Sequence, residues 1–183
     1  KELPMDSPLP IAIAALLALL PFGVSAWRGL DGRPIVFWPA LLVALAGTAS
    51  LLGFEARRGF PTGFGDALWL SIAACLVVYA LVATFSREVR RLAIFLVPFL
   101  VISGLIGTVW LGGDGPETRR VLRPEVASIW VAIHVGTSLA TYALVTLAAG
   151  AGIAILIQER AIKRKAKGAL SARLPSVAAC ERL

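Results

Sequence analysis

Ile11-Ala-Ile-Ala-Ala-Leu-Leu-Ala-Leu-Leu20 is the centre of an uncharged segment, residues 8–27, that decides the fold class of this chain. A membrane-spanning helix needs roughly 20 consecutive apolar residues to cross a hydrocarbon core of about 30 Å. The segment has that length, and a helix satisfies all of its backbone hydrogen bonds internally. It lacks a cationic start and a clear cleavage site, so we expect a retained transmembrane helix and not a signal peptide.

The rest of the chain repeats this pattern. Only 16% of the 183 residues are charged, whereas a soluble domain carries about 25%, so the lipid bilayer must be part of the solvent. The sequence therefore predicts an all-α, polytopic transmembrane helix bundle of about five spans. The predicted spans are residues 8–27, 35–54, 66–85, 92–111 and 126–158. We expect Asp66 to cap the third span, because aspartate is a preferred N-cap residue.

The basic residues give the orientation of the bundle. The formal charge is +7, but the basic residues lie at span ends and in one tail, which indicates topology and contact with anionic lipid and argues against nucleic-acid binding. With a cytoplasmic C-terminus, the inner face carries about twice the basic residues of the outer face, so we predict N-out/C-in. The inner set is Arg28, Arg33, Arg87, Arg90, Arg91 and the tail from Arg160, and the outer set is Lys1, Arg57, Arg58, Arg119, Arg120 and Arg123.

Two tails complete the predicted organisation. Residues 1–7 form a short N-terminal tail in which Met5 is a candidate natural start, and residues 159–183 form a basic cytoplasmic tail that looks cut off at Leu183. Cys75 and Cys180 belong to no CxxC or CxxCH motif, so the chain is neither an evident thiol oxidoreductase nor a c-type cytochrome. No catalytic motif stands out, and the sequence leaves open whether the protein is an enzyme.

The single histidine lies in a polar stripe of the last span. Trp130, His134, Ser138 and Tyr142 follow at four-residue spacing, which puts them along one helix face. A polar stripe on an apolar helix is expected to face the bundle interior or a cavity. Two interpretations are open: hydrogen bonds between helices, worth about 0.6 kcal/mol each in membranes, or binding of a ligand.

The small number of ligating side chains limits which ligand the stripe could bind. A single histidine without a carboxylate in its span is a poor proton relay, and zinc takes three or four protein ligands. One neutral imidazole is enough for an axial ligand to haem iron. The residue types therefore favour haem as the cofactor, with Trp69, Trp110 and Trp130 either as an interfacial aromatic belt or as walls for a flat apolar ligand.

The stretch Trp130-Val-Ala-Ile-His134-Val-Gly-Thr-Ser-Leu-Ala-Thr-Tyr142, closed by Ile157-Gln-Glu-Arg160, resembles the cytochrome c assembly protein family, nearest its HemX-like or YpjD-like branch. Phe64-Gly-Asp-Ala-Leu-Trp-Leu-Ser71 resembles the start of the third helix in that branch. The resemblance implies a longer bundle of which these spans are the first five, in the bacterial inner membrane. In haem-handling members, a histidine at the outer end of this helix is a haem ligand, and it matches His134. Those members also carry a Trp-rich outer loop and a second outer histidine further on, and this sequence contains neither.

The leading hypothesis is a haem-handling membrane protein, with haem and other cytochrome c assembly or membrane-complex subunits as partners. His134 would ligate the iron, Trp130, Ser138 and Tyr142 would line the site, and Arg119, Arg120 or Arg123 would meet the haem propionates. The alternative is a non-catalytic membrane scaffold or regulatory subunit that packs against partner membrane proteins. A transporter is less favoured, because the spans contain no charged pair and no clear repeat.

Overall fold

The computed structural model describes residues 8–30, 33–57, 63–113 and 129–163, and these ranges are helical with short turns. The helices are α1 (Leu9–Trp27), α2 (Pro34–Arg57), α3 (Phe64–Phe85), α4 (Ala93–Gly113) and α5 (Ile129–Lys163), with a 3₁₀ turn η1 (Val89–Leu92) before α4. All five α-helices are long and apolar enough to cross a membrane. The predicted all-α bundle of five spans is confirmed.

α5 continues beyond the boundary that the sequence predicts. The apolar run ends near Gln158, but the helix extends to Lys163. Glutamate, arginine, alanine and lysine are good helix formers, so the end of hydrophobicity is not the end of the helix. At 1.5 Å per residue, a helix of this length spans about 50 Å, more than the hydrocarbon core of about 30 Å.

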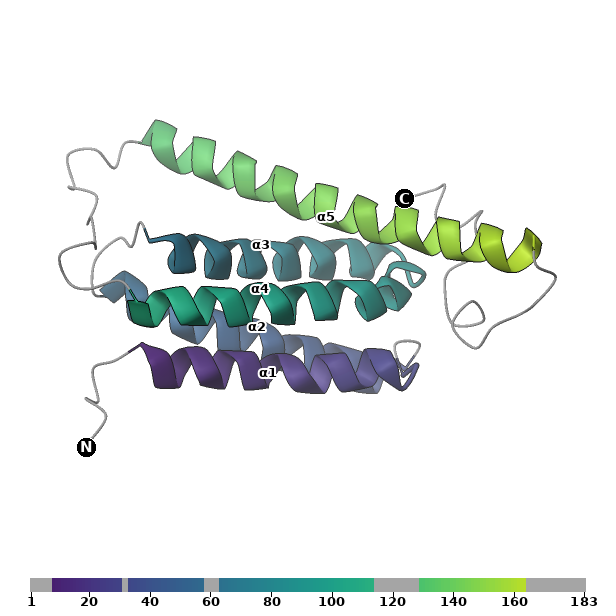
Figure 1. Ribbon diagram of the computed structural model, residues 1–183, viewed down its shortest axis with the longest axis horizontal. Coiled ribbons are helices and arrows are strands. Elements are labelled where there is room, and N and C mark those ends of the chain that lie inside the picture. The colour runs from purple at the N-terminus through teal and green to yellow at the C-terminus, as the bar shows by residue number, and fades with distance from the viewer. Residues whose placement is uncertain (1–7, 31–32, 58–62, 114–128, 164–183) are drawn as a thin grey trace.

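The helices alternate in direction, which separates the basic residues by membrane side (Figure 1). α1, α3 and α5 finish, and α2 and α4 begin, at what we call the basic end. This end carries Arg28, Arg33, Arg87, Arg90, Arg91, Arg160 and Lys163. Arg57 lies at the opposite end, where α2 finishes. The alternation therefore gathers the residues of the predicted inner set on one face.

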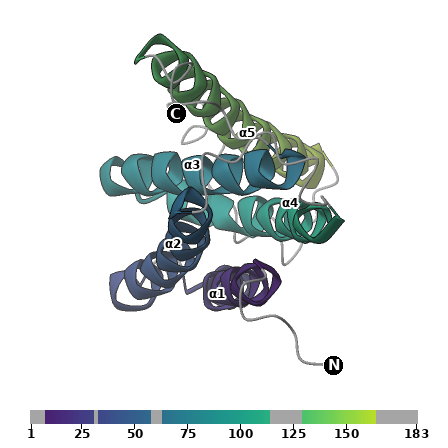
Figure 2. The same ribbon diagram turned by 90° about the vertical axis from the view of Figure 1, so that its left-hand side faces the viewer.

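α1 to α4 share one apolar core. Leu19 of α1, Leu41 of α2, Leu76 of α3 and Leu100 of α4 are all fully buried in it. Small residues let the helix backbones approach: a Cβ added at Gly65 would lie 2.7 Å from the carbonyl oxygen of Gly107 in α4. Seen end-on, these four helices cluster together while α5 crosses the outside of α3 (Figure 2).

An aromatic cluster holds the core near the basic end. The Phe22 ring lies 6.0 Å from Phe37 and 5.7 Å from Tyr79. Arg90, expected among the charges of a loop, is buried, with its guanidinium carbon 5.3 Å from the centre of the Phe37 ring and 5.4 Å from that of Trp38. The Tyr79 hydroxyl donates a 2.9 Å hydrogen bond to the Arg90 carbonyl. A desolvated cation over an aromatic face contributes about 2 kcal/mol, so Arg90 joins η1 to α2 and α3.

The start of α3 differs from the sequence-based expectation. Gly63 occupies the N-cap position without a side-chain cap, and Asp66 lies in the first turn and is buried. The helix therefore begins before Asp66, and the prediction of an aspartate cap is wrong. A carboxylate in the first turn still interacts favourably with the positive end of the helix dipole.

Candidate functional site

α5 packs on the bundle through its second half. Ala143 is fully buried in the core that α1 to α4 share, and Leu147 packs against that core. Further along, Ala154 is fully buried beside Leu92 of η1. The Cys75 side chain of α3 is within hydrogen-bonding reach of Thr146. From Ala143 to Ile157, α5 therefore packs on the bundle.

The first half of α5 diverges from α3 and is open (Figure 1). Trp130 is 75% exposed, Tyr142 is 67% exposed, and His134 is also exposed. At Gly136, no atom lies within 4 Å of an added Cβ. This part of the helix offers a free surface instead of a packed one.

His134 is exposed and lies on the side of α5 away from the buried Ala143. It precedes the core-facing Ala143 by nine residues, which at 3.6 residues per turn is about two and a half turns and puts it on the opposite face of α5. The described helices leave His134 and Tyr142 exposed and Ser138 half-buried, so the expectation that the polar stripe faces the bundle interior or a cavity stays a prediction.

The threonine hydroxyls beside His134 serve their own helix. Thr137 Oγ1 donates to the carbonyls of Ile133 and His134 at 2.9 and 3.0 Å, and Thr141 Oγ1 donates to the Thr137 carbonyl at 2.8 Å. Such bonds satisfy a hydroxyl in lipid without a partner helix. These two residues therefore give no support to the interpretation in which the stripe makes hydrogen bonds between helices.

The structure keeps Ser138 and Tyr142 on α5 with His134, while Trp69 lies in the bundle core. Ser138 is half-buried on α5 between His134 and Tyr142. Trp69 is 1% exposed and packs on α4, so it does not wall a site beside His134. Trp110 contacts the Phe64 ring with the ring centres 5.6 Å apart. Arg119, Arg120 and Arg123 lie outside the described residues.

A single exposed imidazole is suited to a metal that a cofactor already holds, and not to a bare metal ion. Among the described residues, no three histidine, cysteine or acidic side chains come together to hold a bare metal ion. What α5 offers is one imidazole on an open apolar surface, flanked by the half-exposed side chains of Ile133 and Val135. A haem brings its own four equatorial nitrogens and asks the protein for axial ligands and apolar contact. The described residues could hold such a group by one ligand and one apolar wall.

Sequence reasoning missed a groove between α1 and α4 close to the basic end. A tryptophan followed by an arginine at the end of the first span, Trp27-Arg28, is the signal that marks its position. From the sequence, Arg28 counted only among the basic residues of the inner face, because a groove depends on a neighbouring helix that no local pattern specifies.

Comparison with known proteins gives two matches. Residues 37–183 match the family described as cytochrome C assembly protein. A protein of Azospirillum brasilense, described as an uncharacterized 28.8 kDa protein in the nifR3-like 5′ region, is 35% identical over 184 aligned residues, which cover 98% of this chain and 66% of that relative. The chain thus spans about two thirds of the relative's length. No solved structure matches the chain.

Proposed function

This chain belongs to the cytochrome c assembly protein family, and from that premise we propose that it handles haem in the membrane, with His134 as an axial ligand to the iron. Family membership and the five apolar helices indicate a haem-related, multi-pass membrane protein. The proposal adds the bacterial inner membrane as the location, the HemX-like branch as the subtype, and His134 as the site. The observation that carries it is the exposure of the only imidazole on the free face of α5.

The residues around His134 would position the porphyrin. Trp130 lies one helical turn before it and is exposed, so its indole can cover one porphyrin edge. Tyr142 and Ser138 follow His134 along α5. The phenol ring of Tyr142 and the hydroxyls of both residues would line the porphyrin. Haem, when bound, supplies the iron that is carried or exchanged, while the chain supplies the ligand and the apolar surface.

The haem propionates would lie near the start of α5, at the end of the bundle opposite the basic end. Arg119, Arg120 and Arg123 precede α5 in sequence, and an arginine pairs with a carboxylate through two parallel hydrogen bonds. The second wall of the site would come from a partner protein or from residues outside the described ranges. A site with one open side suits a protein that passes haem on, because the porphyrin can leave without unfolding of the bundle.

A visible spectrum tests the proposal. The full chain is purified in detergent after haem has been supplied, and we expect a Soret band with about one haem per chain. His134→Ala should lose the band, and His134→Gly should regain it when free imidazole replaces the missing side chain. Thr141→Ala is the matched control, because this hydroxyl is exposed on the same helix and bonds only to the Thr137 carbonyl among the described residues.

Two results would reject iron ligation by His134. One is a Soret band of equal intensity and position in wild type and His134→Ala. The other is the absence of haem from both proteins after haem has been supplied at saturating concentration.

The open half of α5 also favours a second candidate, a scaffold that receives a span of a partner protein. Gly136 and Ala140 lie four residues apart on exposed helix, and small residues at this spacing allow close helix approach. In that case a partner would co-purify in stoichiometric amount and without a chromophore, and Gly136→Leu would release it while His134→Ala would not.

A further inference from the structure

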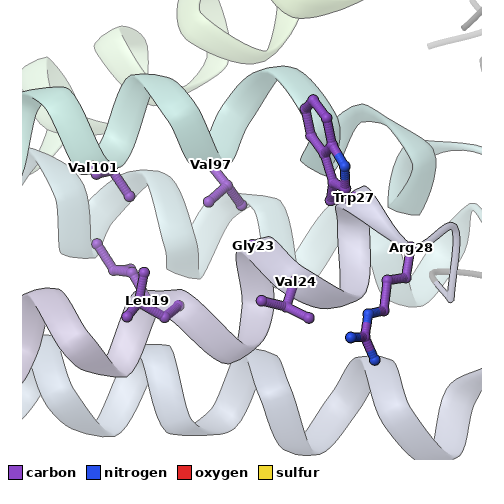
Figure 3. Close-up of a pocket in the computed structure, with 8 residues that line it drawn as sticks. Leu19, Gly23, Val24, Trp27, Arg28, Val97 and Val101 are labelled. Atoms are coloured by element: carbon purple, nitrogen blue, oxygen red, sulfur yellow. The ribbon is translucent and has the colours of Figure 1, made fainter.

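A groove of about 320 Å³ runs between α1 and α4 close to the basic end (Figure 3). This volume is at the lower end of ligand pockets, which measure roughly 300–1,000 Å³. Except for its basic-end mouth, its lining is entirely apolar. The lining residues there are Leu19, Leu20, Gly23, Val24, Val97 and Val101.

The floor of the groove depends on a glycine. A Cβ added at Gly23 would lie 3.0 Å from Cγ1 of Val97, so the missing side chain keeps this floor open. Leu20 and Val24 form the rim and are about half exposed, at 50% and 49%. In a membrane this rim meets lipid, so a chain of methylene groups can enter the groove without crossing water.

Two residues of different chemistry stand at the basic-end mouth of the groove. Trp27 extends toward α4 across this end, and Arg28 extends from the next residue on the other side of α1 (Figure 3). Indole rings concentrate at the level of the lipid headgroups. The Arg28 side chain is exposed, and it forms no ion pair among the described residues. A long exposed side chain can turn toward a headgroup while its stem stays on the apolar surface.

The charge at this end selects the headgroup. Arg33 and Arg87 are exposed at the same end as Arg28, and the field they create attracts anions. Each basic side chain near an anionic lipid surface contributes about 1 kcal/mol. We propose that the groove binds a single anionic phospholipid, with an acyl chain along α1 and α4, the Trp27 indole at the glycerol level, and the phosphate at Arg28. This site is separate from the open face of α5 and does not depend on haem.

Native mass spectrometry of the full chain tests the proposal. The protein is titrated with dioleoylphosphatidylglycerol and, separately, with dioleoylphosphatidylcholine, which has the same chains and no net charge. We expect the first phosphatidylglycerol to bind at least about fivefold more tightly, the factor that one basic side chain supplies. Arg28→Gln should remove this preference. Arg87→Gln, an exposed arginine at the same end but not in the groove, should retain it.

A second pair of variants tests the acyl-chain site itself. Leu20→Trp fills the groove from its rim and should weaken binding of both lipids by roughly tenfold, the effect of displacing about two methylene groups from apolar contact. Leu17→Trp is the matched control, because Leu17 is 57% exposed on the same helix and does not line the groove. Far-UV circular dichroism verifies that each variant keeps its helices.

Three outcomes would overturn the proposal. The first is equal binding of the two lipids by wild type. The second is an equal loss of preference in Arg28→Gln and Arg87→Gln, which would indicate a diffuse charge effect. The third is equal weakening by Leu17→Trp and Leu20→Trp, which would indicate ordinary lipid contact around the whole bundle.

Discussion

Gly47 lies where α1 and α2 pack closely, and replacing it by alanine should destabilise the bundle. A Cβ at this position would overlap Cβ of Ala18, and it would lie 3.4 Å from Cα and 3.6 Å from the carbonyl oxygen of Ala15. None of these atoms can rotate away, because they are backbone atoms or the first side-chain carbon. The helices must therefore separate, and Leu41 and Leu51 on the same helix lose contacts on both sides of the crossing.

The expected magnitude follows from two opposing terms. Alanine is favoured over glycine inside a helix by about 1 kcal/mol. Overpacking of a well-packed core costs about 1–3 kcal/mol, and here it meets atoms without freedom to adjust. Gly53→Ala is the control on the same helix, because no atom lies within 4 Å of its added Cβ, so only the favourable term acts there. We expect Gly47→Ala to be less stable than Gly53→Ala by about 2 kcal/mol.

Unfolding in mixed detergent micelles measures this difference. The fraction of helix is followed by circular dichroism as sodium dodecyl sulfate is added, and Gly47→Ala should unfold at a lower detergent fraction than Gly53→Ala. Ala18→Gly introduced together with Gly47→Ala should recover part of the loss, since residues in contact show coupling of about 0.5–3 kcal/mol. The reasoning is refuted if Gly47→Ala unfolds at the same detergent fraction as Gly53→Ala, or if the double variant shows no coupling.

Two further predictions concern other contacts of the core and use the same unfolding measurement. Tyr79→Phe removes the 2.9 Å hydrogen bond to the buried Arg90 carbonyl and should lower stability by about 1 kcal/mol; unchanged stability would mean that this carbonyl finds another donor. Gly65→Ala brings a Cβ to 2.7 Å from the Gly107 oxygen and 2.9 Å from the Leu111 nitrogen, and it should cost about 1–3 kcal/mol. A gain in stability there would show that α3 and α4 separate without loss.

Five helices and their approximate bounds were predictable from the sequence. A span must be apolar over its whole length, so run length alone marks residues such as Ile11–Leu20 as membrane helix. The ends were less predictable: α5 extends past Gln158 to Lys163, and α3 begins before Asp66. Hydropathy reports contact with lipid and not the backbone hydrogen bonds that continue a helix into water.

Buried charges were a second point at which sequence reasoning was insufficient. Glu55 and Arg90 lie next to turns in the sequence, where solvated charges are the usual expectation, yet both side chains are buried. Arg90 is buried because the rings of Phe37 and Trp38 come from a helix distant in sequence. No local pattern around Arg90 contains that information.

By itself, the sequence determined that the chain crosses a membrane, which ends are basic, and that His134 is the one imidazole on the last span. Only the tertiary structure decided that this imidazole is exposed on α5, because the sequence does not specify which face of the helix its neighbours cover. The face with Ala143 and Ala154 packs more closely on its neighbours, and that choice turns His134 to the open side. Periodicity shows which residues share a helix face, but the neighbouring helices determine which face is covered.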